Sequence, residues 1–204
     1  MKTARLMIFV LCAVLVMGSS ALAAGLKLGD TAPMSATKMK NVDDREASIA
    51  DVKGPNGTLV IFTCNHCPFA KAWEVRISTI GNAAQKNGVG VIAINANDPS
   101  SYAEDRFEEM QKRAKERGFQ FPYVVDATSD VAREFGATRT PECYLFDKNG
   151  KLIYHGAVDD NYADAAKVDK HYLEDAINAL VAGKDVPVKE SKAVGCTIKL
   201  RAKG

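Results

Sequence analysis

Two short apolar runs, separated by one segment of helical periodicity, constrain the fold of this chain more than any other feature. Residues 58–63 and 89–95 are almost continuously apolar, which is typical of strands that are buried on both faces. Between these runs the apolar residues recur near helical spacing, at Phe69, Trp73, Ile77 and Ile80, and Asn87-Gly88 supplies a stop. The pattern is one strand-helix-strand unit, so the sequence predicts an α/β fold.

Shorter elements flank this unit on both sides. Residues 25–53 are polar and irregular, and a turn at 41–45 suggests short edge strands there. Further on, the patterns predict a strand over 121–126, a short helix over 129–135, and a hairpin of strands 142–147 and 151–157 joined by Lys148-Asn149-Gly150.

Two further helices are predicted from their end signals. One begins after Ser101, which with Glu104 forms a capping box, and Gly118 ends it. Its densely charged side, which includes Asp105, is interpreted as a solvated face. The other spans about 169–182, with Asp169 as its cap.

The start of the chain has the pattern of a secretory signal. Lys2 and Arg5 precede an apolar run over residues 6–17, and Ala21-Leu22-Ala23 provides a small-residue cleavage site. The run is shorter than the ~20 apolar residues that a membrane span needs. We therefore expect a signal peptide over 1–23, a domain over 24–183, a tail over 184–204 near the domain, and a periplasmic or secreted protein with no membrane span in the mature chain.

Charge excludes one class of partner. The predicted signal carries two basic residues and no acidic one, so its removal lowers the formal net charge from +2 to zero. A neutral chain without a basic stripe has nothing to attract phosphate backbones, and no nucleic-acid partner is expected.

The cysteines indicate redox chemistry. Cys64 and Cys67 are separated by two residues, in the run Thr63-Cys64-Asn65-His66-Cys67-Pro68, at the junction of the predicted strand over 58–63 and the helix that follows it. The partial positive charge at a helix N-terminus favours a thiolate, and two cysteines at this spacing can close a disulfide ring. We predict Cys64 as the attacking thiol, Cys67 as the more buried resolving thiol, and His66, as imidazolium, as a stabiliser of the Cys64 thiolate.

Two other readings of these three residues stay open. In an exported protein the cysteine pair could be a permanent structural disulfide, and Cys64, His66 and Cys67 could instead ligate a metal. The position of the motif between a buried strand and an amphipathic helix favours redox exchange. No cofactor and no metal are expected.

Pro141 has an unusual place for a proline. It stands just before an apolar strand, where proline removes a ladder hydrogen bond unless the backbone turns. The X-Pro bond is also the one bond type in which the cis form is common. Thr140-Pro141 is therefore a candidate for a role at the site, and an ordinary strand-entry proline is the alternative.

Taken together, these motifs resemble the thioredoxin superfamily and, within it, the peroxiredoxin-like redoxin (AhpC/TSA-related) family. The resemblance covers nearly all of residues 26–200. The segments that carry it are Gly29-Asp30-Thr31-Ala32-Pro33, the Cys64 to Phe69 motif, Ala93-Ile94-Asn95-Ala96-Asn97-Asp98, Leu145-Phe146-Asp147, Gly156-Ala157-Val158-Asp159-Asp160 and Gly195-Cys196-Thr197-Ile198-Lys199. It implies a thioredoxin-like fold, a central mixed sheet flanked by helices, with an N-terminal extension and an inserted strand-helix segment. It also implies a cis-proline loop at Thr140-Pro141 facing the redox cysteines.

The resemblance leaves the substrate open. True peroxiredoxins place Thr or Ser three residues before the peroxidatic cysteine, whereas here Cys64 precedes Cys67 and Ile61 precedes Cys64. Neither assignment completes a peroxidase site, although Arg139 or Arg76 could supply charge. Disulfide exchange with protein thiols and a thiol reductant or oxidant is therefore predicted first, and a thiol peroxidase is the alternative.

The remaining cysteines and histidines support lesser hypotheses. Cys196 is a candidate resolving thiol or a small buried residue, and Cys143 is interpreted as part of the core. A third hypothesis is a copper-binding thioredoxin-fold chaperone, for which His155 and His171 are the candidate ligands.

Overall fold

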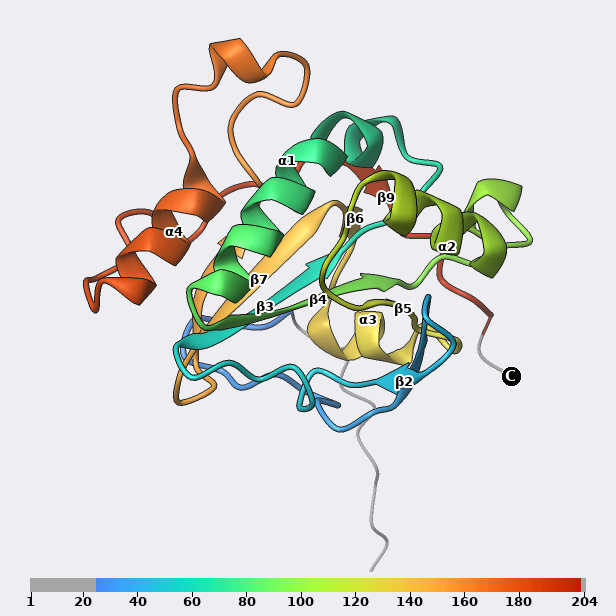
Figure 1. Cartoon of the computed structure of the whole chain (residues 1–204), viewed down its shortest axis with the longest axis horizontal. Helices are drawn as coiled ribbons and strands as arrows, with labels where there is room; N and C mark the ends of the chain where they lie inside the picture. The colour runs from blue at the N-terminus through green and yellow to red at the C-terminus, as the bar shows by residue number, and fades with distance from the viewer. Residues whose placement is uncertain (1–24, 203–204) are drawn as a thin grey trace, which may run out of the picture.

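A seven-stranded mixed sheet forms the centre of the computed structural model, which describes residues 25–202 (Figure 1). The predicted signal peptide over 1–23 lies outside the described residues. The strand order is β2-β1-β5-β4-β3-β7-β8. The strands are β1 (Met39–Asn41), β2 (Glu46–Ala47), β3 (Gly57–Phe62), β4 (Val89–Asn95), β5 (Tyr123–Val125), β7 (Glu142–Asp147) and β8 (Leu152–Gly156). β3 pairs with β4 in parallel and with β7 in antiparallel fashion, so the sheet is mixed as predicted.

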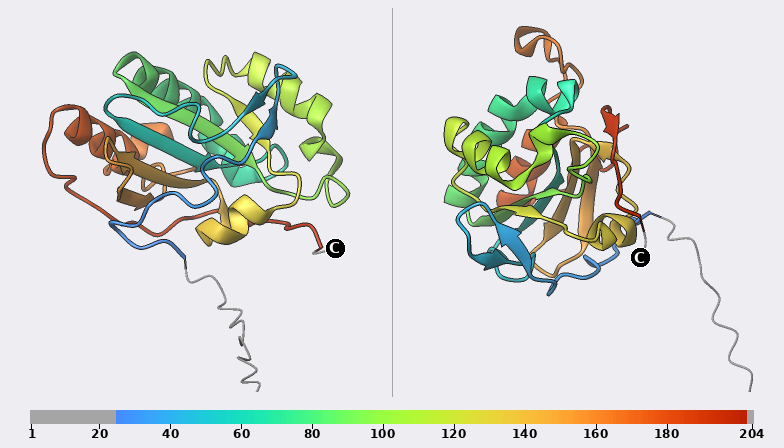
Figure 2. Two further views of the ribbon diagram at one scale, coloured as in Figure 1. Left: turned by 90° about the horizontal axis from the view of Figure 1, so that it is seen from below. Right: turned by 90° about the vertical axis from the view of Figure 1, so that its right-hand side faces the viewer.

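Helices cover both faces of this sheet (Figures 1 and 2). The helices α1 (Pro68–Lys86), α2 (Phe107–Glu116) and α4 (Tyr172–Val181) pack on one face, and α3 (Asp130–Phe135) packs on the other. β3 shows why both faces need cover, because its side chains alternate: Leu59 and Ile61 join the core under α1, whereas Phe62 joins the core under α3. The predicted strand-helix-strand unit is therefore confirmed as β3-α1-β4.

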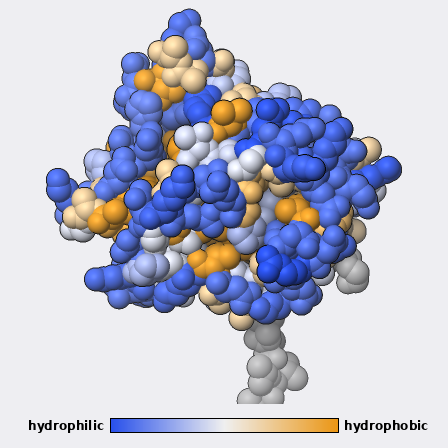
Figure 3. All heavy atoms as spheres, in the orientation of Figure 1, coloured by the Kyte–Doolittle hydropathy of each residue, from blue (hydrophilic) through white to orange (hydrophobic). Residues whose placement is uncertain are grey.

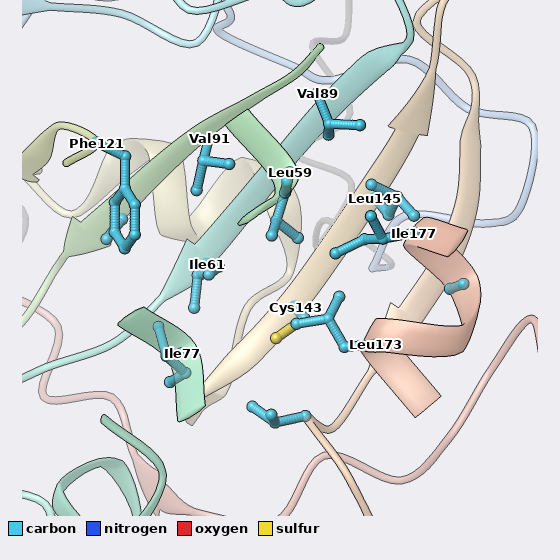
Figure 4. Close-up of a cluster of buried hydrophobic side chains, with 14 of the residues drawn as sticks. Leu59, Ile61, Ile77, Val89, Val91, Phe121, Cys143, Leu145, Leu173 and Ile177 are labelled. Carbon is cyan, nitrogen blue, oxygen red and sulfur yellow. The ribbon is translucent and has the colours of Figure 1, made fainter. Parts of the chain in front are cut away.

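The core under α1 and α4 also contains Cys143 (Figure 4). The side chain of Cys143 is fully buried and lies beside Leu173 of α4 and near Ile61 of β3 in this view. Burial raises the pKa of its thiol well above the ordinary value. The interpretation of Cys143 as a core residue is confirmed.

The short elements near the N-terminus and the hairpin follow the sequence patterns closely. β1 and β2 form an antiparallel pair at one edge of the sheet, and Asp44 in their turn has φ 66°. At the other edge, β7 and β8 form the predicted hairpin, in which Gly150 has φ 77°, a conformation that glycine adopts without strain. The N-terminal extension thus adds strands to the edge opposite the hairpin.

Two predicted helix starts are wrong. The predicted capping box at Ser101 does not form: residues Ala103–Asp105 make a separate 3-10 turn (η1), and α2 begins at Phe107 after Arg106 adopts extended backbone. The reason is that Asp105 is 3% exposed and faces the protein interior, whereas we expected it on a solvated helix face. Asp169 does not cap the last helix, because α4 starts three residues later, at Tyr172, and His171 occupies the N-cap position.

The C-terminal segment lies across the domain. It contributes β9 (Cys196–Thr197), which pairs with β6 (Arg139–Thr140) beside the start of α1 (Figures 1 and 2). Ile198 is buried in the core under α3. The face drawn in Figure 3 is predominantly hydrophilic, with small separate hydrophobic patches. Within residues 25–202, no helix has both the length and the hydrophobicity that a bilayer span requires.

Candidate active site

The two cysteines of the C-x-x-C motif lie at the N-terminus of α1. Cys67 is the N-cap residue and Pro68 opens the helix, a position where proline is favoured because its missing N–H has no intrahelical partner. Cys64 lies in the loop that follows β3. Its side chain is 5% exposed and that of Cys67 is fully buried. The burial order is the predicted one, with Cys67 the more buried of the two.

The two thiols share a hydrogen bond that shifts their pKa values in opposite directions. Hydrogen bonding from the Cys64 thiol, followed by that from Cys196, lowers the pKa of Cys67 to about 4 although burial opposes this shift. The same hydrogen bond to Cys67, together with burial and the charge of Asp105, raises the pKa of Cys64. The resting negative charge is thus favoured on Cys67, whereas the sequence led us to expect it on Cys64.

Thr140 contacts both sulfur atoms. The Thr140-Pro141 peptide bond is cis, and the Thr140 hydroxyl lies 3.2 Å from Cys64 Sγ. When Cys67 is protonated, its thiol donates to the backbone carbonyl oxygen of Thr140 at 3.2 Å. Thr140 therefore has an acceptor for a Cys67 proton and a hydroxyl donor for a Cys64 thiolate. The Thr140-Pro141 loop can therefore stabilise the form in which Cys64 is the thiolate and Cys67 is protonated.

His66 is held by a buried carboxylate. Its Nδ1 lies 2.6 Å from Oδ2 of Asp105, and its ring stacks on Tyr102 at a centroid distance of 3.8 Å. The backbone N–H groups of Asn65 and His66 both donate to Asp105 Oδ1, at 2.7 and 3.3 Å. A carboxylate that accepts from Nδ1 fixes the orientation of an imidazole ring. His66 is therefore oriented by Asp105.

Asp105 and Asn97 belong to this site, and sequence reasoning assigned neither of them a role. The amide of Asn97 donates to Asp105 Oδ2 at 2.9 Å, and Asn95 adds a longer contact to Oδ1 at 3.4 Å. Asn95 and Asn97 stand at the carboxyl end of a buried strand, where parallel sheets place ligand-binding side chains. This position in the sequence could have identified the two asparagines as site residues. Asp105 carried no such signal, because its neighbours have helical periodicity.

Cys196 joins the site from the C-terminal segment. Its backbone N–H donates to Cys67 Sγ at 3.4 Å, and the pairing of β9 with β6 sets Cys196 opposite Thr140. The side chain is partly exposed. Burial and hydrogen bonding to Cys67 raise its pKa to about 11. Three cysteines thus meet at one place, with Cys67 innermost.

In the part of the chain that the structure describes, neither arginine considered for a peroxidase hydrogen-bonds to Cys64 or Cys67, although the charge of Arg139 opposes the rise in the pKa of Cys196. Arg139 donates to Thr197 Oγ1 (3.0 Å) and to the carbonyl of Gly195 (3.4 Å) in the tail. Arg76 donates to Asp159 at 2.5 Å and to backbone carbonyls of the following loop. Both guanidinium groups therefore hold chain segments in place.

One cluster has donor atoms close enough to share a metal ion. Among residues 25–202, ligand atoms of Cys64, His66 and Asp105 lie within 4.8 Å of one another. The Asp105 oxygens are already satisfied by the hydrogen bonds described above, so the cluster needs no ion to balance it. The histidines of the copper hypothesis lie elsewhere: His155 binds Glu142 (2.7 Å) and His171 lies near Glu174 (3.7 Å).

Comparisons with known proteins agree with this architecture. The AhpC/TSA family model matches residues 28–155, which is more than half of the chain. A curated relative, thiol-disulfide oxidoreductase ResA of Geobacillus thermodenitrificans (strain NG80-2), is 28% identical over 125 residues, covering 61% of this chain and 66% of that protein. The match thus spans just under two thirds of the relative's length.

Solved structures extend the likeness over most of the chain. An uncharacterized conserved protein from Geobacillus kaustophilus is 37% identical with a TM-score of 0.81, covering 87% of this chain and 94% of that one. A thioredoxin-like protein in its oxidized form, 20% identical, has a TM-score of 0.61 over 78% of this chain and 99% of that one, and shows the fold. The chain therefore belongs to the AhpC/TSA family of the thioredoxin superfamily and has a thioredoxin-like fold.

Proposed function

We propose that this protein is an exported thiol–disulfide oxidoreductase that exchanges disulfides with partner proteins through Cys64 and Cys67. The observation that carries the proposal is the shared contact of both sulfurs with Thr140, 3.2 Å from each, at the N-terminus of α1. The name of the ResA relative supports this activity. Export follows from the predicted signal peptide and gives a periplasmic or secreted location.

The first step moves a proton within the pair. In the resting dithiol the charge lies on Cys67, and the Cys64 thiol donates to it. Transfer of the Cys64 proton to Cys67 creates a Cys64 thiolate, which accepts a hydrogen bond from the Thr140 hydroxyl. The new Cys67 thiol then donates to the Thr140 carbonyl oxygen. The pKa directions of the two thiols oppose this transfer, so the contacts with Thr140 are what stabilise the Cys64 thiolate.

Two displacements complete the exchange. The Cys64 thiolate attacks one sulfur of a partner disulfide, forms a mixed disulfide and releases a partner thiolate. Cys67 then gives its proton to that thiolate, attacks Cys64 Sγ and releases the second partner thiolate. Two electrons pass from the protein to the partner, and the product is the Cys64–Cys67 disulfide. The same steps in reverse oxidise a partner dithiol.

The thiol peroxidase is the second candidate, because the sequence resembles the peroxiredoxin-like redoxin family. Its position is weaker here, since Arg76 and Arg139 are occupied away from the sulfurs. Stoichiometric hydrogen peroxide should therefore give no rapid sulfenic acid on Cys64 or Cys67. Fast, repeated peroxide turnover would replace the proposed function with the peroxidase.

The reduction potential of the Cys64/Cys67 couple tests the proposal directly. The protein is equilibrated in glutathione buffers, its thiols are trapped by alkylation, and their state is read by mass spectrometry. A reversible two-electron couple between about −120 and −270 mV is expected. A pair that stays oxidised below about −300 mV would be a structural disulfide and would contradict the proposal. Cys143→Ala is the matched control, because that thiol lies in the core and should leave the potential unchanged.

A further inference from the structure

The C-terminal segment places a third thiol against the innermost cysteine of the pair. Cys196 N–H donates to Cys67 Sγ at 3.4 Å, and Cys196 pairs in register with Thr140, the residue that contacts both other sulfurs. Cys64 and Cys196 therefore approach Cys67 from two different chain segments. Because Cys67 is fully buried, the thiols packed against its sulfur are the ones positioned to attack it.

A glycine at position 195 allows the C-terminal segment to lie close to Thr140. A Cβ atom at position 195 would overlap the backbone carbonyl of Thr140, so only glycine allows the tail to lie this close. On the far side of Cys196, the backbone N–H of Ile198 donates to Thr138 O at 3.0 Å, and that of Lys199 donates to Asn97 Oδ1 at 2.8 Å. Cys196 is thus held on both sides.

We propose that Cys196 is a third redox residue that exchanges disulfide partners with Cys64 at Cys67. This inference rests on the proposed function, because its starting point is the Cys64–Cys67 disulfide. Cys196 loses its proton and attacks Cys67 Sγ, the Cys67–Cys196 bond forms, and the Cys64–Cys67 bond breaks. Cys64 leaves as a thiolate and takes up a proton. No electrons are gained or lost, so the step needs no external oxidant.

The exchange changes what the oxidised protein can do. With the disulfide between Cys67 and Cys196, the more exposed Cys64 is again a free nucleophile. It can form a mixed disulfide with a partner that Cys67 cannot resolve, because Cys67 is already bonded. A partner thiol must then release the partner, which rearranges the partner's disulfides without net reduction. The tail thus gives the oxidised protein a disulfide-rearranging activity.

The test maps the disulfides of the protein after oxidation by one two-electron equivalent. After acid quenching and alkylation, trypsin leaves Cys64 and Cys67 together in peptide 54–71 and Cys196 in peptide 193–199. We expect a cross-linked pair of these peptides in which Cys64 carries the alkyl group. Cys64→Ser should still form the cross-link and Cys67→Ser should not. Recovery of the Cys64–Cys67 disulfide alone in the wild-type protein, with no cross-link in Cys64→Ser, would overturn the proposal.

A glycine variant tests the geometry without altering a sulfur. Gly195→Ala should reduce the cross-linked fraction several-fold, because the added methyl group forces the tail away from Thr140. Val194→Ala, at the neighbouring and 37% exposed position, should leave the fraction unchanged. Equal cross-linking in Gly195→Ala and wild type would contradict the claim that this contact delivers Cys196.

The two proposals fail differently. The Cys196→Ser variant lacks the third thiol. The reduction potential of its Cys64/Cys67 couple therefore tests the proposed function alone. A reversible couple in that variant, with no cross-link in the wild type, refutes the role of Cys196 alone. An irreversible couple in that variant refutes the proposed function itself.

Discussion

Nδ1 of His66 lies 2.6 Å from Oδ2 of Asp105, although the two residues are 39 positions apart in the chain. His66 lies between the two cysteines of the motif, and Asp105 ends the short turn η1 that precedes α2. The contact joins the loop after β3 to the loop after β4. It therefore fixes the imidazole beside Cys64 through a residue from outside the motif.

Replacing Asp105 by Asn should change both stability and thiol reactivity. Asp105 accepts hydrogen bonds from two backbone N–H groups in a buried position, and weakening them should cost about 1–3 kcal/mol in free energy of unfolding. Hydrogen bonding to Cys67, burial and the charge of Asp105 together raise the pKa of Cys64, so removal of that charge should lower it. Urea unfolding and the rate of alkylation at neutral pH measure the two effects.

The neighbouring Glu104 provides the matched control for this variant. Its carboxylate is exposed and bonds Lys71 at 3.0 Å on the surface. Glu104→Gln should therefore change the free energy of unfolding by no more than about 0.5 kcal/mol. If both variants behave alike, the buried position of Asp105 has no special role.

Thr140→Val should slow the attack of Cys64 on a disulfide. The variant keeps the shape of the side chain but loses the hydroxyl 3.2 Å from Cys64 Sγ, which lowers the pKa of that thiol. A hydrogen bond worth about 0.5–1.5 kcal/mol corresponds to a rate reduction of about 2–10-fold. Stopped-flow reaction of the reduced protein with an aromatic disulfide measures it. Thr140→Ser keeps the hydroxyl and should react at nearly the wild-type rate.

The reduced protein should become more stable as the pH rises from about 4 to about 9. The pKa of Cys67 is lowered to about 4 in the folded protein from an ordinary value of 9.0, so across this window the unfolded chain binds a proton that the folded chain does not. The stabilisation is fully present above the ordinary value and is lost as the pH falls toward 4. Urea unfolding of the reduced protein, compared with reduced Cys67→Ala, isolates this contribution. Parallel curves for the two proteins would contradict the assignment of the thiolate to Cys67.

Asp159→Asn should destabilise the fold at a distance from the sulfurs. Asp159 is 4% exposed, accepts from Trp73 Nε1 at 2.8 Å and pairs with Arg76 at 2.5 Å. Weakening a buried ion pair that also accepts a hydrogen bond should cost about 1–3 kcal/mol. Thermal unfolding measures the loss. Asp160→Asn, at an exposed position, should stay within about 0.5 kcal/mol of wild type.

The sequence predicts those parts of the fold that local patterns determine. β3, β4 and α1 follow from two apolar runs and one helical repeat, and β7 was predicted at its observed bounds, Glu142–Asp147. In these elements local propensity and burial agree. The same agreement predicts the strand-to-helix junction at Cys64 and Cys67.

The parts that were missed depend on contacts between distant segments. Ser101 and Glu104 have the spacing of a helix cap, but the buried Asp105 stops the helix, because its carboxylate bonds a loop that lies 40 positions earlier. Cys196 is a candidate resolving thiol from the sequence, but no local pattern places it against Cys67, which lies 129 positions away. Local periodicity contains no information on such pairings.

The position of β9 beside β6 also sets an order of events during synthesis. Cys196 follows Cys67 by 129 residues, and at ~5–20 residues per second a ribosome needs on the order of ten seconds to add them. During that interval a growing chain contains the Cys64/Cys67 dithiol but not the residue that packs against its inner sulfur. Until Cys196 is added, an oxidant that meets the growing chain can couple Cys67 only to cysteines that precede Cys196, and Cys64 is the nearest of these in the sequence.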